Sequence, residues 1–203
     1  MWELGLRAHR REHGLLCARR LHEVSAEQLA DWFRICGETV ADCGRRAELW
    51  RDLAAGLERT HAGDAGALLS ACEGRLAGSG GLLNRLAGFQ AYSDPLAKKA
   101  FLFAKICERR GWLQVVDPEH WEVSADNVLM RLALRSGLVE PGPLERVRSA
   151  TREALGSLAV ASGVSVPVLD DLLWERGRGD PDLLGREAGD LHEPDREPGS
   201  AWY

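Results

Sequence analysis

Lysine is the residue type in this sequence that most directly suggests chemistry. The chain has 26 basic side chains among 203 residues, but its only lysines are Lys98, Lys99 and Lys105, all within the stretch DPLAKKAFLFAK. Random placement among the basic positions would make the lysines consecutive about 1% of the time. Unlike arginine, lysine can lose its proton near neutral pH and then act as a nucleophile. We therefore interpret the cluster as the source of a reactive amine, with an ordinary solvated helix face as the alternative.

The lysines belong to a predicted helix that is apolar on almost every face over residues 100–107. This pattern is typical of a helix buried in the middle of a domain. Because successive residues are rotated by about 100°, Lys98 and Lys105 share one stripe with Leu102 between them, whereas Lys99 points elsewhere. We expect two amines along one side of a buried helix.

Helical patterns continue along most of the chain, and the sequence predicts an all-α domain over residues 1–178, as one body or as two lobes with a cleft between them. The first expected helices are one that follows a Ser25 cap and reaches Val40, one over 45–59, one that follows an Asp64 cap, and a short one with Leu82, Leu83 and Leu86. The lysine helix comes next. It is followed by a helix with a Ser124 cap and Asp126 in its first turn, and by helices over 144–161 and 166–176.

Charge is unevenly distributed along the sequence. The net charge is −5, and residues 179–203 alone hold seven acids and two arginines, so residues 1–178 carry equal numbers of acids and bases. Because this acidic tail is also rich in proline and glycine, we expect it to be flexible. The neutral body, with an arginine-rich N-terminal end, does not exclude binding to nucleic acid.

Other compositional features exclude several classes of protein. No apolar run approaches the length of a membrane span, and the start MWELGLRAHRREHG lacks the apolar stretch of a signal peptide, so we expect a cytoplasmic protein without a membrane partner. The cysteines show neither C-x-x-C pairing nor metal-ligand spacing. We interpret them as reduced thiols and expect neither a metal nor a cofactor; they are Cys17, Cys36, Cys43, Cys72 and Cys107.

Three segments of the C-terminal half can be compared with known proteins, because both their residues and their order along the chain are distinctive. They are KKAFLFAKI, ADNVLMRLALRSGLVE and VASGVSVPVLDDLLWERGR. Together they resemble the archaeal-type 8-oxoguanine DNA glycosylases, a branch of the helix-hairpin-helix DNA glycosylase superfamily. The resemblance covers about the C-terminal half of the chain. It implies a helix-hairpin-helix DNA glycosylase-like fold.

The resemblance also implies roles for individual residues. Lys98 takes the place of the nucleophilic lysine, because the seven-residue step to Lys105 matches from Lys98 and not from Lys99. Asp126 takes the place of the catalytic aspartate. The positions implied for recognition of the damaged base are Trp174, Asp170 and Lys105, with Trp50 as a match to a second pocket tryptophan.

The implied function is base-excision repair by a DNA glycosylase with AP lyase activity, removing 8-oxoguanine through a lysine Schiff base and β-elimination. The residue types suit this chemistry, which needs a neutral amine, a carboxylate to stabilise positive charge on the sugar, and an aromatic surface for the extruded base. The expected partner of this monomer is double-stranded DNA containing oxidised guanine, or single-stranded DNA. Phosphate contacts are expected from the loop before Lys98 and from Arg109, Arg110 and Arg135.

Each candidate residue also has a purely structural explanation. Acids such as Asp126 are favoured at helix starts by the backbone dipole. Trp174 follows two leucines and would fit a helix core, and each arginine would fit a solvated face.

Three other functions stay open. The region before Lys98 is shorter than in the resembled family, which fits a catalytically inactive DNA-binding module of the same fold. The segment HRREH has the form H-x-x-E-H and would place His9 and His13 with Glu12 as in a zinc hydrolase, although its arginine-rich surroundings favour an exposed polar helix. A protein–protein adaptor built on amphipathic helices would explain the composition but not the lysine cluster.

Overall fold

A computed structural model describes residues 2–34 and 37–195, which form helices joined by turns, without a β-strand in those ranges. This confirms the all-α prediction. The α-helices are α1 (Trp2–Arg11), α2 (Ala18–Leu21), α3 (Ala26–Trp32), α4 (Cys43–His61), α5 (Ala65–Ser70), α6 (Leu82–Leu86), α7 (Lys98–Arg109), α8 (Asn127–Arg135), α9 (Leu144–Ser162) and α10 (Val166–Gly177), with short 3-10 turns at Gln90–Tyr92 and Pro118–His120.

The N-terminal half is built around α4, against which α2 and α3 pack. The predicted Ser25 cap is confirmed, because the Ser25 hydroxyl and the Gln28 side chain form a reciprocal capping box at the start of α3. The expected continuation of this helix to Val40 is wrong. The helix ends at Trp32, and the Thr39 hydroxyl donates a hydrogen bond back to the Ala30 carbonyl at 2.9 Å, so the chain folds back beside α3.

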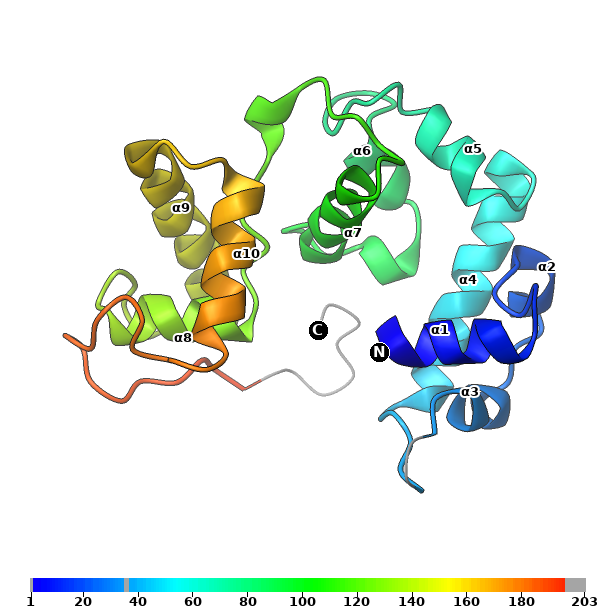
Figure 1. Ribbon diagram of the computed structural model, residues 1–203, viewed down its shortest axis with the longest axis horizontal. Helices are drawn as coiled ribbons and strands as arrows, with labels where there is room; N and C mark the ends of the chain where they lie inside the picture. Colours follow the sequence, from blue (N-terminus) through cyan, green and yellow to red (C-terminus); the bar gives the residue numbers. More distant parts are fainter. Residues whose placement is uncertain (1, 35–36, 196–203) are drawn as a thin grey trace.

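The lysine helix α7 lies between the two halves of the molecule (Figure 1), with α6 packed against it. One face of α7 enters a core shared with α5, α6 and the connection that follows α7. Residues of this central core include Leu68, Cys72, Leu76, Leu82, Phe101 and Trp121. The Asp64 cap on α5 is confirmed by a 2.7 Å hydrogen bond from the Gly66 amide. Cys72 and Leu76 are buried although α5 ends before them.

The C-terminal half is a three-helix unit in which α8, α9 and α10 pack against one another. Its core contains Val123, Leu129, Leu132, Leu155, Ala159, Leu169 and Leu173. Gly177 allows α10 to approach α8 closely, because a Cβ atom at this position would lie 2.6 Å from Cδ1 of Leu132. In the described part of the chain no single helix has the length and apolar character to cross a membrane, although α9 and α10, bent by 112° at their break, meet that test as a pair.

The acidic segment after Arg178 lies along α8 (Figure 1). Arg135 of α8 forms ion pairs with Asp182 at 2.6 Å and Asp190 at 2.7 Å, and Arg131 pairs with Glu193 at 2.6 Å. Residues 179–195 have no regular secondary structure, but three of their acids, Asp182, Asp190 and Glu193, pair with arginines on α8. The expected flexibility of the tail stays a prediction.

Candidate active site

A cavity of about 590 Å³ opens between one face of α7, the start of α8 and the outer face of α10. Lys98 and Lys105 contribute to it from α7, Asp126 from the start of α8, and Asp170 and Trp174 from α10. The structure thus brings together five of the six site residues that the sequence analysis singled out. The sixth, Trp50, lies elsewhere.

The wall formed by α7 follows the predicted stripe of Lys98, Leu102 and Lys105. Leu102 is 45% exposed, so the expectation of a helix buried on almost every face is wrong. The face that carries the two lysines opens into the cavity. Lys99 is not part of this wall; its half-buried amine has a lowered pKa, caused first by burial and second by the nearby guanidinium of Arg46 on α4.

Asp126 is the N-cap residue of α8, and its Oδ1 atom accepts a hydrogen bond from the Leu129 amide at 3.0 Å. The predicted cap at Ser124 is wrong. The Ser124 amide instead donates to Oδ2 of Asp170 at 2.7 Å, across to α10. Capping therefore fixes the Asp126 carboxylate at the mouth of the cavity.

Burial raises the pKa of the Asp126 carboxyl above its ordinary value of 3.8. The hydrogen bond from the Leu129 amide, the positive charge of Lys98 and a hydrogen bond from the Trp174 side chain act in the opposite direction, while the nearby Asp170 carboxylate adds to the rise. The charge of Lys98 thus acts directly on Asp126, although the two residues begin different helices.

Lys105 and Asp170 form a buried ion pair at the back of the cavity. The Lys105 Nζ atom lies 2.7 Å from Oδ1 of Asp170 and 3.2 Å from Oδ1 of Asp171, and the Lys105 and Asp170 side chains are each only 5% exposed. Because Asp170 also accepts the Ser124 amide, both of its oxygens are engaged. A buried pair with satisfied partners is a rigid polar surface that presents both a donor and acceptors.

Trp174 supplies an aromatic surface at the cavity, and its side chain is 40% exposed. The guanidinium of Arg178, the residue directly after α10, lies 4.8 Å from the centre of its ring. The explanation of Trp174 as a core residue is therefore wrong. Leu173, its neighbour, is the residue that enters the core.

Trp50 lies in the N-terminal half and does not line the cavity. Its ring makes an edge-to-face contact with Phe33 at 5.6 Å, and it packs against the small core formed by α3 and α4. This position follows from the apolar stripe of α4, which faces α3. The implied role of Trp50 as a second base-stacking residue is not supported by its location.

The arginines expected to contact phosphates have different surroundings. Arg109 is exposed at the cavity edge and forms an ion pair with Asp171, and the guanidinium of Arg110 lies 5.9 Å from the Trp112 ring. Arg135 is buried beneath the acidic segment, where it pairs with two aspartates. A phosphate role for Arg135 is therefore a wrong prediction, because its charge is already satisfied inside the protein.

Three charged residues behind the site were not predicted from the sequence, namely the buried Asp94 and Arg148 and the partly buried Arg152. Arg148 is fully buried and forms an ion pair with Asp94 at 2.6 Å. Both arginines lie on α9, one turn apart, and Arg148 is interleaved with the buried Val147 and Thr151. A basic residue within the apolar stripe of an amphipathic helix is the signal that could have identified it.

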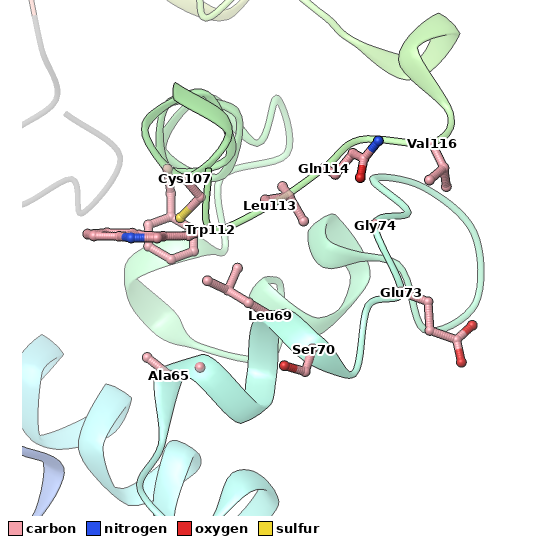
Figure 2. Close-up of a pocket in the computed structure, with 12 residues that line it drawn as sticks. Ala65, Leu69, Ser70, Glu73, Gly74, Cys107, Trp112, Leu113, Gln114 and Val116 are labelled. Atoms are coloured by element: carbon pink, nitrogen blue, oxygen red, sulfur yellow. The ribbon is translucent and has the colours of Figure 1, made fainter. Parts of the chain in front are cut away.

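A larger cavity, of about 750 Å³, lies on another side of α7. Figure 2 shows Cys107, Trp112 and Leu113 on one side of it and Leu69 and Ser70 on the other. It contains none of the predicted site residues. Burial raises the pKa of the Cys107 thiol, which makes the sulfur a poor nucleophile. This cavity lacks the paired amine and carboxylate found at the smaller one.

The cysteines are free thiols wherever the structure describes them. Cys17 is exposed, Cys43 is half-buried, and Cys72 and Cys107 are buried. Cys36 lies outside the described residues.

The H-x-x-E-H segment does not form a single helical face. Helix α1 ends at Arg11, before Glu12 and His13. The rings of His9 and His13 touch edge to face at 5.3 Å, and Glu12 forms an ion pair with Arg20. Within residues 2–34 and 37–195 no three His, Cys, Asp or Glu side chains converge as a metal site would require. The zinc-hydrolase alternative has no support from this arrangement.

No known protein family matches this chain, and no curated protein matches it in sequence.

Proposed function

We propose that this protein is a DNA glycosylase with AP lyase activity that removes 8-oxoguanine from DNA, with Lys98 as the nucleophile and Asp126 as the catalytic carboxylate. The observation that carries the proposal is that these two residues, each at the start of a separate helix, line one cavity together with an exposed tryptophan. A helix-hairpin-helix glycosylase fold is part of the same proposal. The segment before α7 would supply the hairpin, although the amides of Leu96 and Lys98 are bound to the Asp94 carboxylate in this structure.

The surroundings of the two residues suit the reaction. The charge of Lys98 acts on Asp126, and the carboxylate is also held by the Leu129 amide, so its position is fixed before any substrate enters. Its partly desolvated carboxylate would stabilise positive charge that develops on the sugar as the base leaves. Lys99, whose pKa is lowered by burial and by the nearby charge of Arg46, does not line this cavity.

In the proposed reaction the Lys98 ammonium first loses a proton to solvent, and its neutral Nζ atom then attacks C1′ of the damaged nucleotide. The N-glycosidic bond breaks, and the base leaves with the bonding electrons and gains a proton. The attached nitrogen loses a proton, the sugar ring opens with protonation of its ring oxygen, and a protonated imine joins Lys98 to C1′. Removal of a C2′ proton, for which Asp126 is the proposed base, lets the C3′–O bond break and the 3′ phosphate leave.

The damaged base would occupy the cavity after extrusion from the duplex. Trp174 offers an aromatic surface for stacking, and the Lys105–Asp170 pair offers a donor and acceptors for the edge of a purine. The cavity volume of about 590 Å³ is within the range of small-molecule sites.

The proposal is tested by borohydride trapping on a labelled duplex that contains one 8-oxoguanine. We expect a covalent band from the wild type and from Lys99→Gln, and none from Lys98→Gln. Lys99→Gln is the matched control because it removes a neighbouring amine from the same helix turn without touching the cavity.

Two results would contradict the proposal. Trapping by Lys98→Gln would assign the nucleophile to another amine. Tight duplex binding by a wild type that never traps or excises would instead support the alternative of a catalytically inactive DNA-binding module.

A further inference from the structure

Helix α9 lies behind the site and contacts the segments that lead into both α7 and α8. Arg148 of α9 forms a fully buried ion pair with Asp94, with 2.6 Å between its Nη2 atom and Oδ2. Its Nη1 atom also contacts the Glu145 carboxylate at 3.1 Å. Because burying two charges is costly without close pairing and further hydrogen bonds, this arrangement needs every one of those contacts.

Asp94 also binds the backbone at the start of the lysine helix α7. Its Oδ1 atom accepts the Leu96 amide at 3.1 Å, and its Oδ2 atom accepts the Lys98 amide at 3.1 Å. Between them, Ala97 has a φ of 49°, in the left-handed region that non-glycine residues rarely adopt. The carboxylate therefore holds the backbone of the proposed nucleophile in a tight and unusual turn.

Arg152, one turn further along α9, connects this turn to the segment before Asp126. Its guanidinium donates to the Leu96 carbonyl through Nη2 and to the Val123 carbonyl through Nε, the latter at 3.3 Å. It also forms an ion pair with Glu122, and it lies 5.4 Å from the centre of the Phe101 ring on α7. One side chain thus contacts the chain just before Lys98 and just before Asp126.

This bridge matters because α7 and α8 belong to different cores. Phe101 of α7 lies in the central core, whereas Leu129 of α8 lies in the core of the C-terminal half. The two helices are also connected through α10, because Val166 packs against both cores and Lys105 of α7 pairs with Asp170. The separation between the Lys98 amine and the Asp126 carboxylate depends on what connects the two segments.

We propose that Arg152 is a positioning residue that sets the placement of Lys98 relative to Asp126, with the Asp94–Arg148 pair as its support. Arg152 does not line the cavity and acts through the backbone of both segments. The planar guanidinium suits this role, because its donors point in several fixed directions, whereas a lysine amine at the same position has one nitrogen on a flexible stem. The catalytic part of this inference rests on the proposed function.

The first experiment compares Arg152→Met and Arg152→Lys with Arg146→Met, a control on the same helix whose side chain is 70% exposed. For both Arg152 variants we expect the single-turnover rate of 8-oxoguanine excision to fall about 10- to 100-fold, because a small misplacement of reacting groups has effects of this size. The affinity for the duplex should change less than about threefold, since no DNA contact is removed. Lysine should not rescue the rate.

A second measurement does not depend on activity. The pKa of Asp126 is read by NMR from its labelled carboxyl carbon, with and without Lys98→Met, in the wild-type, Arg152→Lys and Arg146→Met backgrounds. Where the two residues are held together, removing the Lys98 charge should raise the pKa of Asp126. We expect this rise in the wild type and in Arg146→Met, and a smaller rise or none in Arg152→Lys.

The two measurements separate the possible failures. If the wild type does not excise 8-oxoguanine, the proposed function fails, and the NMR comparison alone decides the positioning role. An unchanged Lys98–Asp126 coupling in folded Arg152→Lys would overturn the inference. So would a loss of excision that matches the fraction of unfolded protein measured by thermal melting.

Discussion

Asp126 serves both as the cap of α8 and as the proposed catalytic carboxylate. Its Oδ1 atom accepts the Leu129 amide, while the same carboxylate faces Lys98 and Trp174. The capping hydrogen bond ties the Asp126 carboxylate to the backbone of α8, so this side chain has less freedom than one without such a bond. The two roles can be separated by substitution because asparagine caps helices nearly as well as aspartate does.

We predict that Asp126→Asn will keep its stability and that Asp126→Ala will not. Asparagine retains the capping oxygen, whereas alanine loses it at a cost of about 1 kcal/mol in the free energy of unfolding. Both variants should excise 8-oxoguanine about 100- to 10,000-fold more slowly, because both lack the carboxylate. Urea denaturation and single-turnover excision measure the two effects, and an active asparagine variant would remove Asp126 from the catalytic role.

The raised pKa of Asp126 predicts a specific pH dependence. A carboxyl whose pKa is higher in the folded state than its ordinary 3.8 contributes stability below 3.8, and this contribution is lost as the pH rises through the folded-state pKa. The stability of the wild type relative to Asp126→Asn should therefore be greatest in acid and decline toward neutral pH. Activity should show the opposite trend, rising as Asp126 ionises at a pH above 3.8. Chemical denaturation over a pH series tests the stability trend, and kcat/KM over the same series tests the activity trend. A stability difference between the wild type and Asp126→Asn that grows with pH would contradict the predicted stability trend.

At the scale of elements, the contact between α8 and α10 places Trp174 beside Asp126. Gly177 permits that contact, since Leu132 and Val128 leave no room for a Cβ atom. Leu132 is fully buried, so its side chain has little freedom to move aside. The small size of one residue on α10 therefore helps to set the width of the cavity.

We predict that Gly177→Ala will destabilise the protein by about 1–3 kcal/mol through overpacking against Leu132. Gly156→Ala on α9 is the matched control, because nothing lies within 4 Å of a Cβ atom at that position. That control should gain about 0.5–1 kcal/mol, as expected for alanine replacing glycine inside a helix. Urea denaturation of both variants measures the change in the free energy of unfolding. A stabilised Gly177→Ala would mean that α8 and α10 can separate without cost.

Sequence patterns located the helices well where the signal was local. The Ser25 capping box and the Asp64 cap depend on residues within one turn, and both are present in the structure. The Ser124 cap failed because its amide is recruited by Asp170, which lies 46 positions later in the chain. The early end of α3 likewise depends on a contact from Thr39, which the apolar stripe does not reveal.

At the scale of the whole molecule, the acidic segment balances the charge of α8. Asp182 and Asp190 flank the buried Arg135, and each has a lowered pKa whose largest cause is the hydrogen bond with that arginine. The arginine is thereby supplied with counter-charges from a part of the chain that has no regular secondary structure. Removing Asp182 and Asp190 would leave the buried Arg135 guanidinium without these two counter-charges, which destabilises a protein.

We predict that the double substitution Asp182→Asn with Asp190→Asn will lower the melting temperature at neutral pH. Groups with a depressed folded-state pKa contribute stability above their ordinary pKa of 3.8, and this contribution is lost as the pH falls through the depressed value. The difference from the wild type should therefore disappear in acid. Glu187→Gln is the control, since it removes an exposed charge from the same segment, and thermal melting over a pH series is the measurement. Equal melting temperatures at neutral pH would show that the segment adds nothing to stability.

Helix periodicity placed Lys98 and Lys105 on one stripe, and the resemblance to the glycosylases grouped them with Asp126, Asp170 and Trp174; all five line one cavity. It could not place Trp50, because a tryptophan on an amphipathic helix fits a core and a pocket equally well. Nor could it reveal Asp94 and Arg152, whose contacts cross from one segment to another. Contacts between distant segments leave no periodic pattern in a sequence, and they position this site.

Because every lysine of this chain lies on α7, NMR can observe this helix selectively. Reductive methylation with ¹³C-labelled formaldehyde would place NMR-visible methyl groups only on this helix and on the chain's α-amine. Lys105 is paired with buried carboxylates, Lys99 lies beside Arg46, and Lys98 lines the cavity, so the three amines have distinct surroundings. Their methyl resonances would follow the entry of a ligand from both sides of one helix, in a protein without a single substitution.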